Sequence, residues 1–469
     1  MTLEISIDFR ARFNQIAEKF NIVHYLLFYF FLHLIQINFP FGSVTYASSG
    51  VCSQAGSGCV FDETYVVQDA LNLLHGIGTG RLPLPSMFGA LGMYIFGSNT
   101  FGWRIFPVLF QIGALYFFFL IAKRFLGERW GLGATVLLSL DTVWFIHGGL
   151  LLNDSTMFFF ALGATELYLR KRYWVSGVMM GLALLSREMI IFWGIALVAY
   201  HLYVNRHSLI PGLKVGIKYA VVALAVFFII LSAYDLAARP ATGSSVNIIQ
   251  SQDVVEGTNG TAITTITSLT SSTTTQYIAN ALAHVEYVIT SFGPGAYVTA
   301  GGAYRPYKDP LSWIFPFVIH NGTIQNAFFV VDSYLTTNVT TSVNGVPVSS
   351  YLIHTYTYQD NPAVWYGFLP GVIGCSYALY KKKETEAAVY CLSGAVANYA
   401  PWLALGVFDS TRLGFNFYYI YTLPFVAMGY TFFFKQLPPR YGKPLMVLNL
   451  LVALAFFVWF FPTHGVTSG

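Results

Sequence analysis

The chain has 469 residues, of which only 10% are charged and 55% are hydrophobic, with a mean hydropathy of +0.57. An ordinary soluble domain has about 25% charged residues, so this composition excludes a soluble globule. It also excludes a disordered chain, because disordered chains are poor in apolar residues. The net charge of +4 is too small for a typical nucleic-acid binder. Four cysteines are too few for a disulfide scaffold. We therefore expect an all-α polytopic membrane protein.

Apolar runs long enough to suggest membrane-spanning helices recur along the chain. A span needs about 20 mostly apolar residues. About eleven runs qualify, and the two at 155–169 and 174–186 are the shortest: 21–40, 103–122, 130–147, 155–169, 174–186, 189–205, 216–234, 362–380, 387–406, 414–434 and 444–461. The run at 84–97 is shorter and carries Pro85, with Pro83 just before it, so it predicts a re-entrant or interfacial helix. The first run is too long for a cleavable signal peptide.

The basic residues indicate which side of the membrane each loop occupies. With a cytoplasmic N-terminus and eleven spans, 18 of the 25 Lys and Arg residues fall on the inner side, in short loops and the N-terminal tail. Such a bias is typical of cytoplasmic loops. The seven outer residues are Arg81, Arg104, Arg187, Arg239, Arg305, Lys308 and Arg412.

This topology divides the chain into five parts. They are a cytoplasmic N-terminus at 1–20, an N-terminal membrane module at 21–234 that includes a first outer loop at 41–102, an extracytoplasmic loop at 235–361, C-terminal membrane helices at 362–461 and an outer tail at 462–469. The two large extracytoplasmic loops are therefore 41–102 and 235–361. The second contains a Thr- and Ser-rich stretch, 264–275, for which we expect flexibility or glycosylation.

Sequons and cysteines agree with an outer location for these loops. Asn-x-Ser/Thr sequons occur at Asn259, Asn321 and Asn338 in the large loop, where N-glycosylation would take place, and at Asn153 at the membrane edge, where we expect none. Cys52 and Cys59 share the first outer loop, so either a short disulfide or two free thiols fits, and the compartment favours the disulfide. The other two cysteines lie in apolar runs and suggest packing residues: Cys375 and Cys391.

Acidic residues at the outer membrane edge are the first candidates for chemistry. Asp62 and Glu63 lie in the first outer loop, and Asp154 lies in a short outer loop between two apolar runs. Charges there are costly and often functional. Each also has a structural alternative, because Asp154 could be a helix N-cap and the Asp62–Glu63 pair could be a solvated helix start.

Outer arginines are the second group of candidates. Arg104 begins a span, Arg187 interrupts an apolar run beside Glu188, and Arg412 precedes an aromatic run. The arginine fork matches phosphate oxygens, so these residues suggest a phosphate site. The alternatives are snorkelling at the interface, a local pair with Glu188 for Arg187, and a local pair with Asp409, three residues earlier, for Arg412. For Arg81 we favour the snorkelling interpretation.

Together these motifs resemble the protein O-mannosyltransferase (dolichyl-phosphate-mannose-protein mannosyltransferase) family of the GT-C glycosyltransferase superfamily, especially its prokaryotic and archaeal members. The resemblance is carried by an ordered set of stretches between about residues 20 and 434, none decisive alone: Phe61–Tyr65, Phe96–Arg104, Leu151–Asp154, Gly181–Arg187, Lys308–Trp313, Asn361–Trp365, Pro401–Trp402, Arg412 and Tyr418–Pro424. Phe61–Tyr65 is similar to the family's Asp-Glu motif, and Leu151–Asp154 to its Leu-Leu-Asp motif.

The chain also departs from the family pattern. The family has His-Pro-Pro-Leu after the first-loop motif, whereas this chain reads Leu82-Pro83-Leu84-Pro85 and lacks the histidine. Arg187 stands where the family usually has a lysine. The loop at 235–361 looks too short for the β-trefoil domain of the eukaryotic enzymes. The Trp-Trp-Asp-Tyr-Gly signature of oligosaccharyltransferases is absent.

The resemblance implies a GT-C enzyme that transfers a hexose, mannose first, from a polyprenyl (dolichyl) phosphate to a hydroxyl on a protein or glycan outside the cytoplasm. On this hypothesis Asp62 is the base and Glu63 orients it. Asp154 holds the acceptor or organises the Asp62 loop. The donor phosphate contacts Arg412 first, Arg187 second, and Arg104 as a further arginine of this set. One base and direct displacement imply inversion at the anomeric carbon.

Other functions also fit the sequence. A lipid-linked sugar transporter or flippase would use Asp141 and Glu166, both inside predicted spans, as pathway residues. A glycan-assembly enzyme with a lipid-linked oligosaccharide acceptor would share the fold. No cofactor is certain; a divalent metal is compatible with two outer carboxylates that meet, although the resemblance implies none. We expect an integral multi-pass protein of the plasma membrane, or of the endoplasmic reticulum if eukaryotic, with an extracytoplasmic active site.

Overall fold

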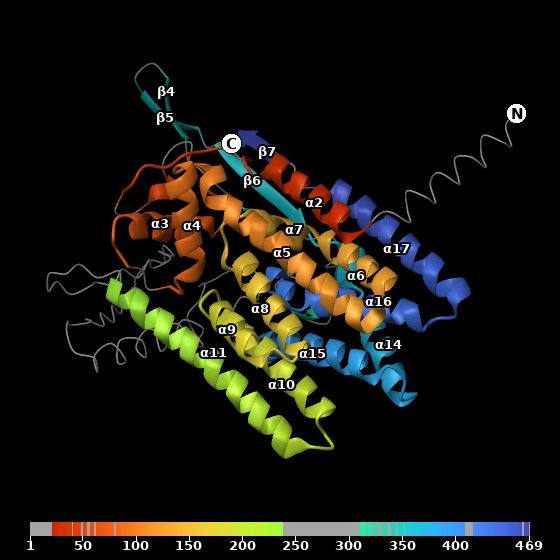
Figure 1. Cartoon of the computed structure of the whole chain (residues 1–469). Coiled ribbons are helices and arrows are strands. Elements are labelled where there is room, and N and C mark those ends of the chain that lie inside the picture. The colour runs from red at the N-terminus through yellow and green to blue at the C-terminus, as the bar shows by residue number, and fades with distance from the viewer. Residues whose placement is uncertain are drawn as a thin grey trace, which may run out of the picture.

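Each of the eleven predicted apolar runs contains helix in the computed structural model (Figure 1). The helical fold class is therefore confirmed. The structure describes residues 21–39, 41–47, 50–53, 57–60, 62–78, 81–237, 310–315, 317–320, 323–326, 331–334, 339–343, 346–350, 352–408, 416–461 and 464–468. The N-terminal tail, Arg412 and the whole segment 238–309 thus lie outside the described residues, as do all three sequons of the large loop in whole or in part.

The N-terminal half contributes ten α-helices to the described structure. They are α2 (Ile22–Gln36), α3 (Glu63–Leu74), α4 (Leu84–Phe96), α5 (Thr100–Leu126), α6 (Glu128–Ser139), α7 (Thr142–Gly149), α8 (Asn153–Leu169), α9 (Tyr173–Leu184), α10 (Ile190–Val204) and α11 (Leu209–Ala237). Figure 1 shows α3 and α4 together at one end of the bundle, at the upper left. Both lie in the segment 41–102, which the sequence analysis assigns to the first outer loop, and α4 is the short helix predicted at 84–97.

The C-terminal half packs its own helices against this set. They are α13 (Pro362–Trp365), α14 (Phe368–Tyr380), α15 (Thr385–Phe408), the 3-10 helix η4 (Asn416–Tyr421), α16 (Leu423–Gln436) and α17 (Pro439–Trp459). Two further 3-10 turns are η1 (Val51–Ser53) and η3 (Pro310–Trp313). The core between the halves is aromatic: the ring centroids of Trp193 on α10 and Phe425 on α16 lie 4.5 Å apart.

Length and hydropathy alone qualify few of these helices as membrane spans. Among the described residues, three helices are long and apolar enough: α5, α11 up to Asp235, and α17. The pair α6 and α7 would add a fourth, although it is bent by 72°. Several predicted spans are shorter helices, α2, α9 and α10 among them. The protein thus has membrane-protein character, and the number of eleven spans stays a prediction.

The bend between α6 and α7 is fixed by polar groups in the core. Asp141 caps α7: its Oδ1 accepts a hydrogen bond from the Trp144 backbone N–H (2.9 Å), and its Oδ2 accepts one from Trp365 Nε1 (2.6 Å). Asn361 Nδ2 donates to the carbonyls of Leu140 and Ala453. These bonds join α7 to both α13 and α17. Asp141, which a transporter would use as a pathway residue, is therefore engaged in holding the helices together.

Short strands, which the sequence analysis did not predict, occupy the end of the large loop and the C-terminal tail. They are β1 (Phe317–His320), β2 (Thr323–Asn326), β3 (Val331–Tyr334), β4 (Val339–Val343), β5 (Val346–Ser350), β6 (Leu352–Gln359) and β7 (His464–Ser468). All pairings are antiparallel: β1 with β2, β4 with β5, and β3–β6–β7 in one sheet. Between β6 and β7, Leu352 is paired with Ser468. The tail therefore lies beside the loop, as the predicted common outer location requires.

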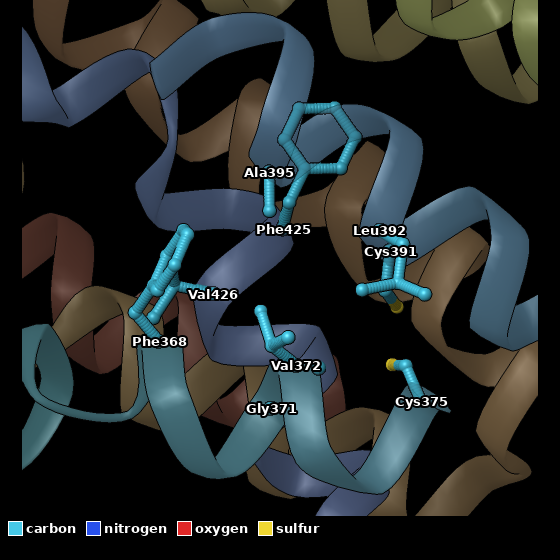
Figure 2. Close-up of a pocket in the computed structure, with 10 residues that line it drawn as sticks. Phe368, Gly371, Val372, Cys375, Cys391, Leu392, Ala395, Phe425 and Val426 are labelled. Carbon is cyan, nitrogen blue, oxygen red and sulfur yellow. The ribbon is translucent and has the colours of Figure 1, made fainter. Parts of the chain in front are cut away.

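A small apolar pocket lies between α14, α15 and α16 (Figure 2). Phe368, Val372, Phe425 and Val426 line it together with Cys375 and Cys391. Both cysteines are buried and free, and in Figure 2 they lie on facing helices. Their predicted role as packing residues agrees with this position. The lining carries no charged side chain, so the pocket does not suggest an active site.

Candidate active site

A buried ion pair links the first outer loop to the start of α5. The Arg104 guanidinium donates to both oxygens of Glu63: from Nε to Oε1 (2.9 Å) and from Nη2 to Oε2 (2.6 Å). Both side chains are fully buried. Glu63 is the first residue of α3, so this contact fixes the helix that follows Asp62. A bidentate pair of this kind has both strength and a defined direction.

Arg104 has no N–H left for a phosphate. Besides the two bonds to Glu63, its Nη1 donates to the carbonyls of Ile37 and Phe39, and its Nη2 donates to the carbonyl of Gly58. An arginine side chain has five N–H groups, and these five bonds use all of them. We therefore revise the predicted donor-phosphate role of Arg104 and propose that it holds the outer loop in place.

The predicted disulfide lies next to this ion pair. Cys52 and Cys59 are bonded, and both are buried. Gly58, whose carbonyl accepts from Arg104, has a φ of +71° and touches the backbone of Gly42, so a side chain there would be both strained and crowded. The loop before Asp62 is thus cross-linked, packed and hydrogen-bonded to Arg104.

Glu63 also binds the turn between α7 and α8, the short loop that contains Asp154. Its Oε1 accepts a hydrogen bond from the Leu151 backbone N–H (2.9 Å), and its Oε2 accepts one from the Val60 N–H (3.0 Å). Asp62 directly precedes Glu63, and Asp154 follows Leu151 by three residues. The structure therefore brings the two predicted acidic motifs together at one carboxylate.

Asp62 is half-buried at the start of α3, and its side chain makes no capping hydrogen bond to that helix.

A second acidic residue of α3, Asp69, pairs with Arg81: its Oδ2 lies 3.7 Å from Arg81 Nη1. The pKa of Asp69 is raised to about 6, because the effect of burial exceeds the opposing effect of the nearby Arg81 charge. The Arg81 guanidinium stacks over the Tyr65 ring at 4.3 Å. The Arg81 side chain is thus partly exposed and stacked on an aromatic ring. This position is compatible with the snorkelling role expected for it.

Asp154 is the centre of a second polar cluster, and its side chain is only 4% exposed. Oδ2 is 2.8 Å from His147 Nδ1, and Oδ1 accepts a hydrogen bond from the Tyr421 hydroxyl (2.7 Å). Leu152, not Asp154, is the N-cap residue of α8. The N-cap alternative for Asp154 is therefore not what the structure shows. A carboxylate placed among such donors is instead held in one orientation.

Arg187 completes this cluster from the turn between α9 and α10. Its Nη1 lies 3.8 Å from Asp154 Oδ1, and its Nε lies 3.8 Å from Glu188 Oε1. Both distances exceed a hydrogen bond. Its guanidinium is 5.9 Å from the centre of the Tyr421 ring. Nε is buried and has no hydrogen-bond partner in the described part of the chain. Arg187 therefore offers a guanidinium that is oriented by charge but not saturated.

Two members of this cluster, His147 and Tyr421, were not predicted from the sequence. His147 lies in an apolar run, and Tyr421 closely follows Tyr418 and Tyr419, so neither residue is distinguished from its neighbours in the sequence. Arg412 and Asp409 lie outside the described residues.

The transporter alternative named Glu166 as its second pathway residue. Glu166 Oε1 lies 2.6 Å from Arg170 Nε in an i,i+4 pair. Among the described residues no group of three or more His, Cys, Asp or Glu side chains could hold a metal ion.

The chain is similar to a known protein family and to proteins of known structure. Residues 81–233 match the family model described as dolichyl-phosphate-mannose-protein mannosyltransferase. Polyprenol-phosphate-mannose–protein mannosyltransferases of two Mycobacterium tuberculosis strains are each 23% identical to it over 450 residues, which cover 86% of this chain and 82% of theirs. The S. cerevisiae protein O-mannosyltransferase Pmt1-Pmt2 complex, solved with the sugar donor, aligns with a TM-score of 0.64 and 11% identity over 94% of this chain and 89% of its own.

These findings confirm the resemblance predicted from the motifs. The likeness to the yeast enzyme shows a shared fold, which agrees with the predicted GT-C architecture. The predicted enzyme class, a glycosyltransferase, is confirmed by the relatives.

Proposed function

We propose that the chain is a membrane mannosyltransferase that moves mannose from a polyprenyl phosphate to a hydroxyl of a protein acceptor. The observation that carries this proposal is the pairing of two sites. One contains the half-buried Asp62, which directly precedes the buried Glu63, and the other contains Arg187, with an unsaturated Nε, beside Asp154. Transfer from a lipid phosphate needs a base for the acceptor and a cation for the phosphate.

In the proposed reaction Asp62 takes the proton of the acceptor hydroxyl. The hydroxyl oxygen attacks the anomeric carbon and forms the new glycosidic bond. The bond from that carbon to the phosphate oxygen breaks, and the polyprenyl phosphate leaves with the electron pair. The new bond forms on the face opposite to the leaving group, so the anomeric configuration inverts.

The charged neighbours divide this work. Arg187 stabilises the charge that develops on the leaving phosphate, because its Nε is buried and unsaturated. Arg412 would assist from a segment outside the described residues. Asp154 holds Arg187 in place rather than contacting the acceptor, since both of its oxygens accept hydrogen bonds from the protein and Arg187 Nη1 lies 3.8 Å from Oδ1. Glu63 and Arg104 fix the loop that presents Asp62.

A divalent metal does not enter this proposal. Both oxygens of Glu63 and both oxygens of Asp154 already accept hydrogen bonds from protein groups. We therefore propose that transfer continues at an unchanged rate in excess EDTA. A loss of activity that Mg²⁺ or Mn²⁺ restores would contradict this part of the proposal.

We also propose an extracytoplasmic active site in the plasma membrane, or on the luminal side of the endoplasmic reticulum in a eukaryote. The support is the bias of basic residues toward the short loops assigned to the inner side. The two polar clusters are built from segments assigned to the outer side: the loop at 41–102, the Leu151–Asp154 turn and the Arg187 turn.

The decisive experiment is an assay with the purified full-length protein in lipid. Radiolabelled polyprenyl-phosphate mannose is offered with a Ser/Thr-rich peptide, and GDP-mannose serves as the control donor. We expect label in the peptide only with the lipid donor. Label that appears in a lipid-linked glycan instead would favour the glycan-assembly alternative. Movement of the intact donor between leaflets, with no transfer, would favour a flippase.

A further inference from the structure

The geometry points to a further positioning residue, and we propose that it is His147. On this proposal His147 fixes the Asp154 carboxylate and, through it, sets the direction of Arg187 in the donor site. The inference rests on the proposed function and adds to it a residue that neither the motifs nor the comparisons assign. His147 is almost completely buried and lies in the last turn of α7, with Nδ1 2.8 Å from Asp154 Oδ2.

This contact fixes both partners. A neutral imidazole that donates from Nδ1 to a carboxylate has its tautomer set, with Nε2 as the acceptor nitrogen. Asp154 is held from two directions, by His147 at Oδ2 and by Tyr421 at Oδ1. A carboxylate bound at one oxygen can rotate about its χ angle, whereas one bound at both oxygens has a fixed plane. The hydrogen bond from His147 is the second of the two bonds that fix the plane of the Asp154 carboxylate.

The helix that carries His147 is itself fixed. Asp141 caps its first turn, and Gln111 Nε2 donates to the Trp144 carbonyl (3.0 Å). A Cβ atom on Gly148 would lie 2.3 Å from the Gln111 Cγ, so glycine is needed for this close approach. The 72° bend before α7 therefore leads into a short, well-supported helix that carries His147 in its last turn. Such support of one functional side chain by another is typical of pre-organised sites.

The consequence for function follows from the order of contacts. His147 contacts Asp154, and Asp154 lies 3.8 Å from Arg187. Loss of the His147 bond would let the carboxylate turn, and the guanidinium would lose its fixed neighbour. We expect weaker use of the lipid-phosphate donor and no effect on acceptor use.

Three substitutions separate positioning from simple packing. In His147→Asn the amide nitrogen can take the place of Nδ1 and donate to Asp154. In His147→Gln the amide extends to the place of Nε2 instead, and His147→Ala removes the donor. We expect kcat/KM for the donor to fall about 10- to 100-fold in the Ala and Gln variants, as for other supporting residues, and the Asn variant to recover most of it. KM for the acceptor peptide should stay unchanged.

His33 provides a matched control. It is also buried, and its ring stacks on Phe145 of α7 at 4.3 Å, but none of its described contacts is to Asp154. His33→Ala should lower thermal stability and leave the donor KM unchanged. A coupled test uses Asp154→Asn, in which the further change His147→Ala should have no additional effect.

The outcomes are distinct. Equal losses in His147→Asn, His147→Gln and His147→Ala, or losses that follow thermal stability alone, would overturn the positioning role. Additive effects of His147→Ala and Asp154→Asn would also overturn it. Transfer by the wild-type protein is measured in the same assay, so failure of the proposed function would appear there first and independently.

Discussion

The backbone N–H of Leu151 donates a hydrogen bond to Glu63 Oε1 over 2.9 Å, although the two residues are 88 positions apart in the chain. The same oxygen accepts from Arg104 Nε. One carboxylate oxygen thus joins the start of α5, the helix after Asp62 and the turn before Asp154. Together with the apolar packing of α3 against Leu151, this carboxylate holds the two candidate acidic motifs near each other.

The first prediction concerns the Glu63–Arg104 pair. Arg104→Lys keeps the charge but has at most three N–H donors, so at least two of the five hydrogen bonds made by Arg104 are lost. Breaking a buried ion pair costs about 3–5 kcal/mol, and we expect a clear fall in the thermal midpoint for both Arg104→Lys and Glu63→Gln. Thermal unfolding in detergent measures this. A normal midpoint together with a raised donor KM in Arg104→Lys would instead return Arg104 to the phosphate site.

The second prediction concerns the proposed base. Asp62→Asn is nearly isosteric and removes the group that accepts the proton, so transfer should fall by about 10²-fold or more while the protein stays folded. Asp69→Asn is the matched control, since Asp69 lies on the same helix and pairs with Arg81. It should keep nearly normal turnover. Normal transfer by purified Asp62→Asn would exclude Asp62 as the base.

Periodicity and charge in the sequence predict much of this fold. Long apolar runs locate the helices, because only a helix satisfies its backbone in lipid. The disulfide follows from two cysteines in one outer loop. The strands were missed although a signal was present: Asn321-Gly322 and Asn344-Gly345, pairs typical of hairpin turns, stand between the strands that pair.

The candidate site is less accessible to sequence reasoning. Three of the five acceptors that saturate Arg104 are backbone carbonyls, which any residue supplies, so no side-chain pattern reveals them. The sequence therefore placed Arg104 with the phosphate arginines. The contact of Tyr421 with Asp154 joins residues 267 positions apart, and only the packing of the two halves brings them together.

The third prediction tests the membrane topology. A cysteine introduced in the large loop as Ser272→Cys should react with an impermeant thiol reagent in intact cells. Ser208→Cys, in the exposed turn between α10 and α11, should react only after permeabilisation. The native free cysteines are buried and should contribute little. The reverse pattern would invert the topology and move both polar clusters to the cytoplasmic face.

The fourth prediction concerns Arg412, which we assign to the donor phosphate from the sequence. It is the only Lys or Arg between Lys383 and Lys435, and Asp409 is the alternative partner. If the arginine fork binds phosphate, Arg412→Lys should raise the donor KM and leave stability nearly unchanged. If Arg412 only pairs with Asp409, Lys should substitute well, and Asp409→Asn should lower stability as much as Arg412→Gln does. Donor titrations and unfolding curves of the three variants distinguish these cases.

The last prediction concerns Arg187, whose guanidinium lies beside Asp154 with its Nε unsaturated among the described residues. A hydrogen bond to a charged group contributes about 1.5–3 kcal/mol, which corresponds to about 10- to 100-fold in affinity. We expect Arg187→Lys to raise the donor KM within this range, because an ammonium cannot reproduce the fork. We expect Arg187→Gln to lower kcat as well, because the cation that stabilises the leaving phosphate is gone.

Arg81→Lys serves as the matched control for this measurement. Arg81 is also an arginine that we assign to the outer side, and it lies near the Asp69 carboxylate, but its guanidinium stacks on Tyr65 and is partly exposed. Its substitution should leave the donor KM within the error of the wild type. If Arg187→Lys and Arg81→Lys behave alike, Arg187 is not a phosphate ligand. The local pair with Glu188 would then explain why an arginine stands in this apolar run, and Glu188→Gln should reproduce its effect on stability.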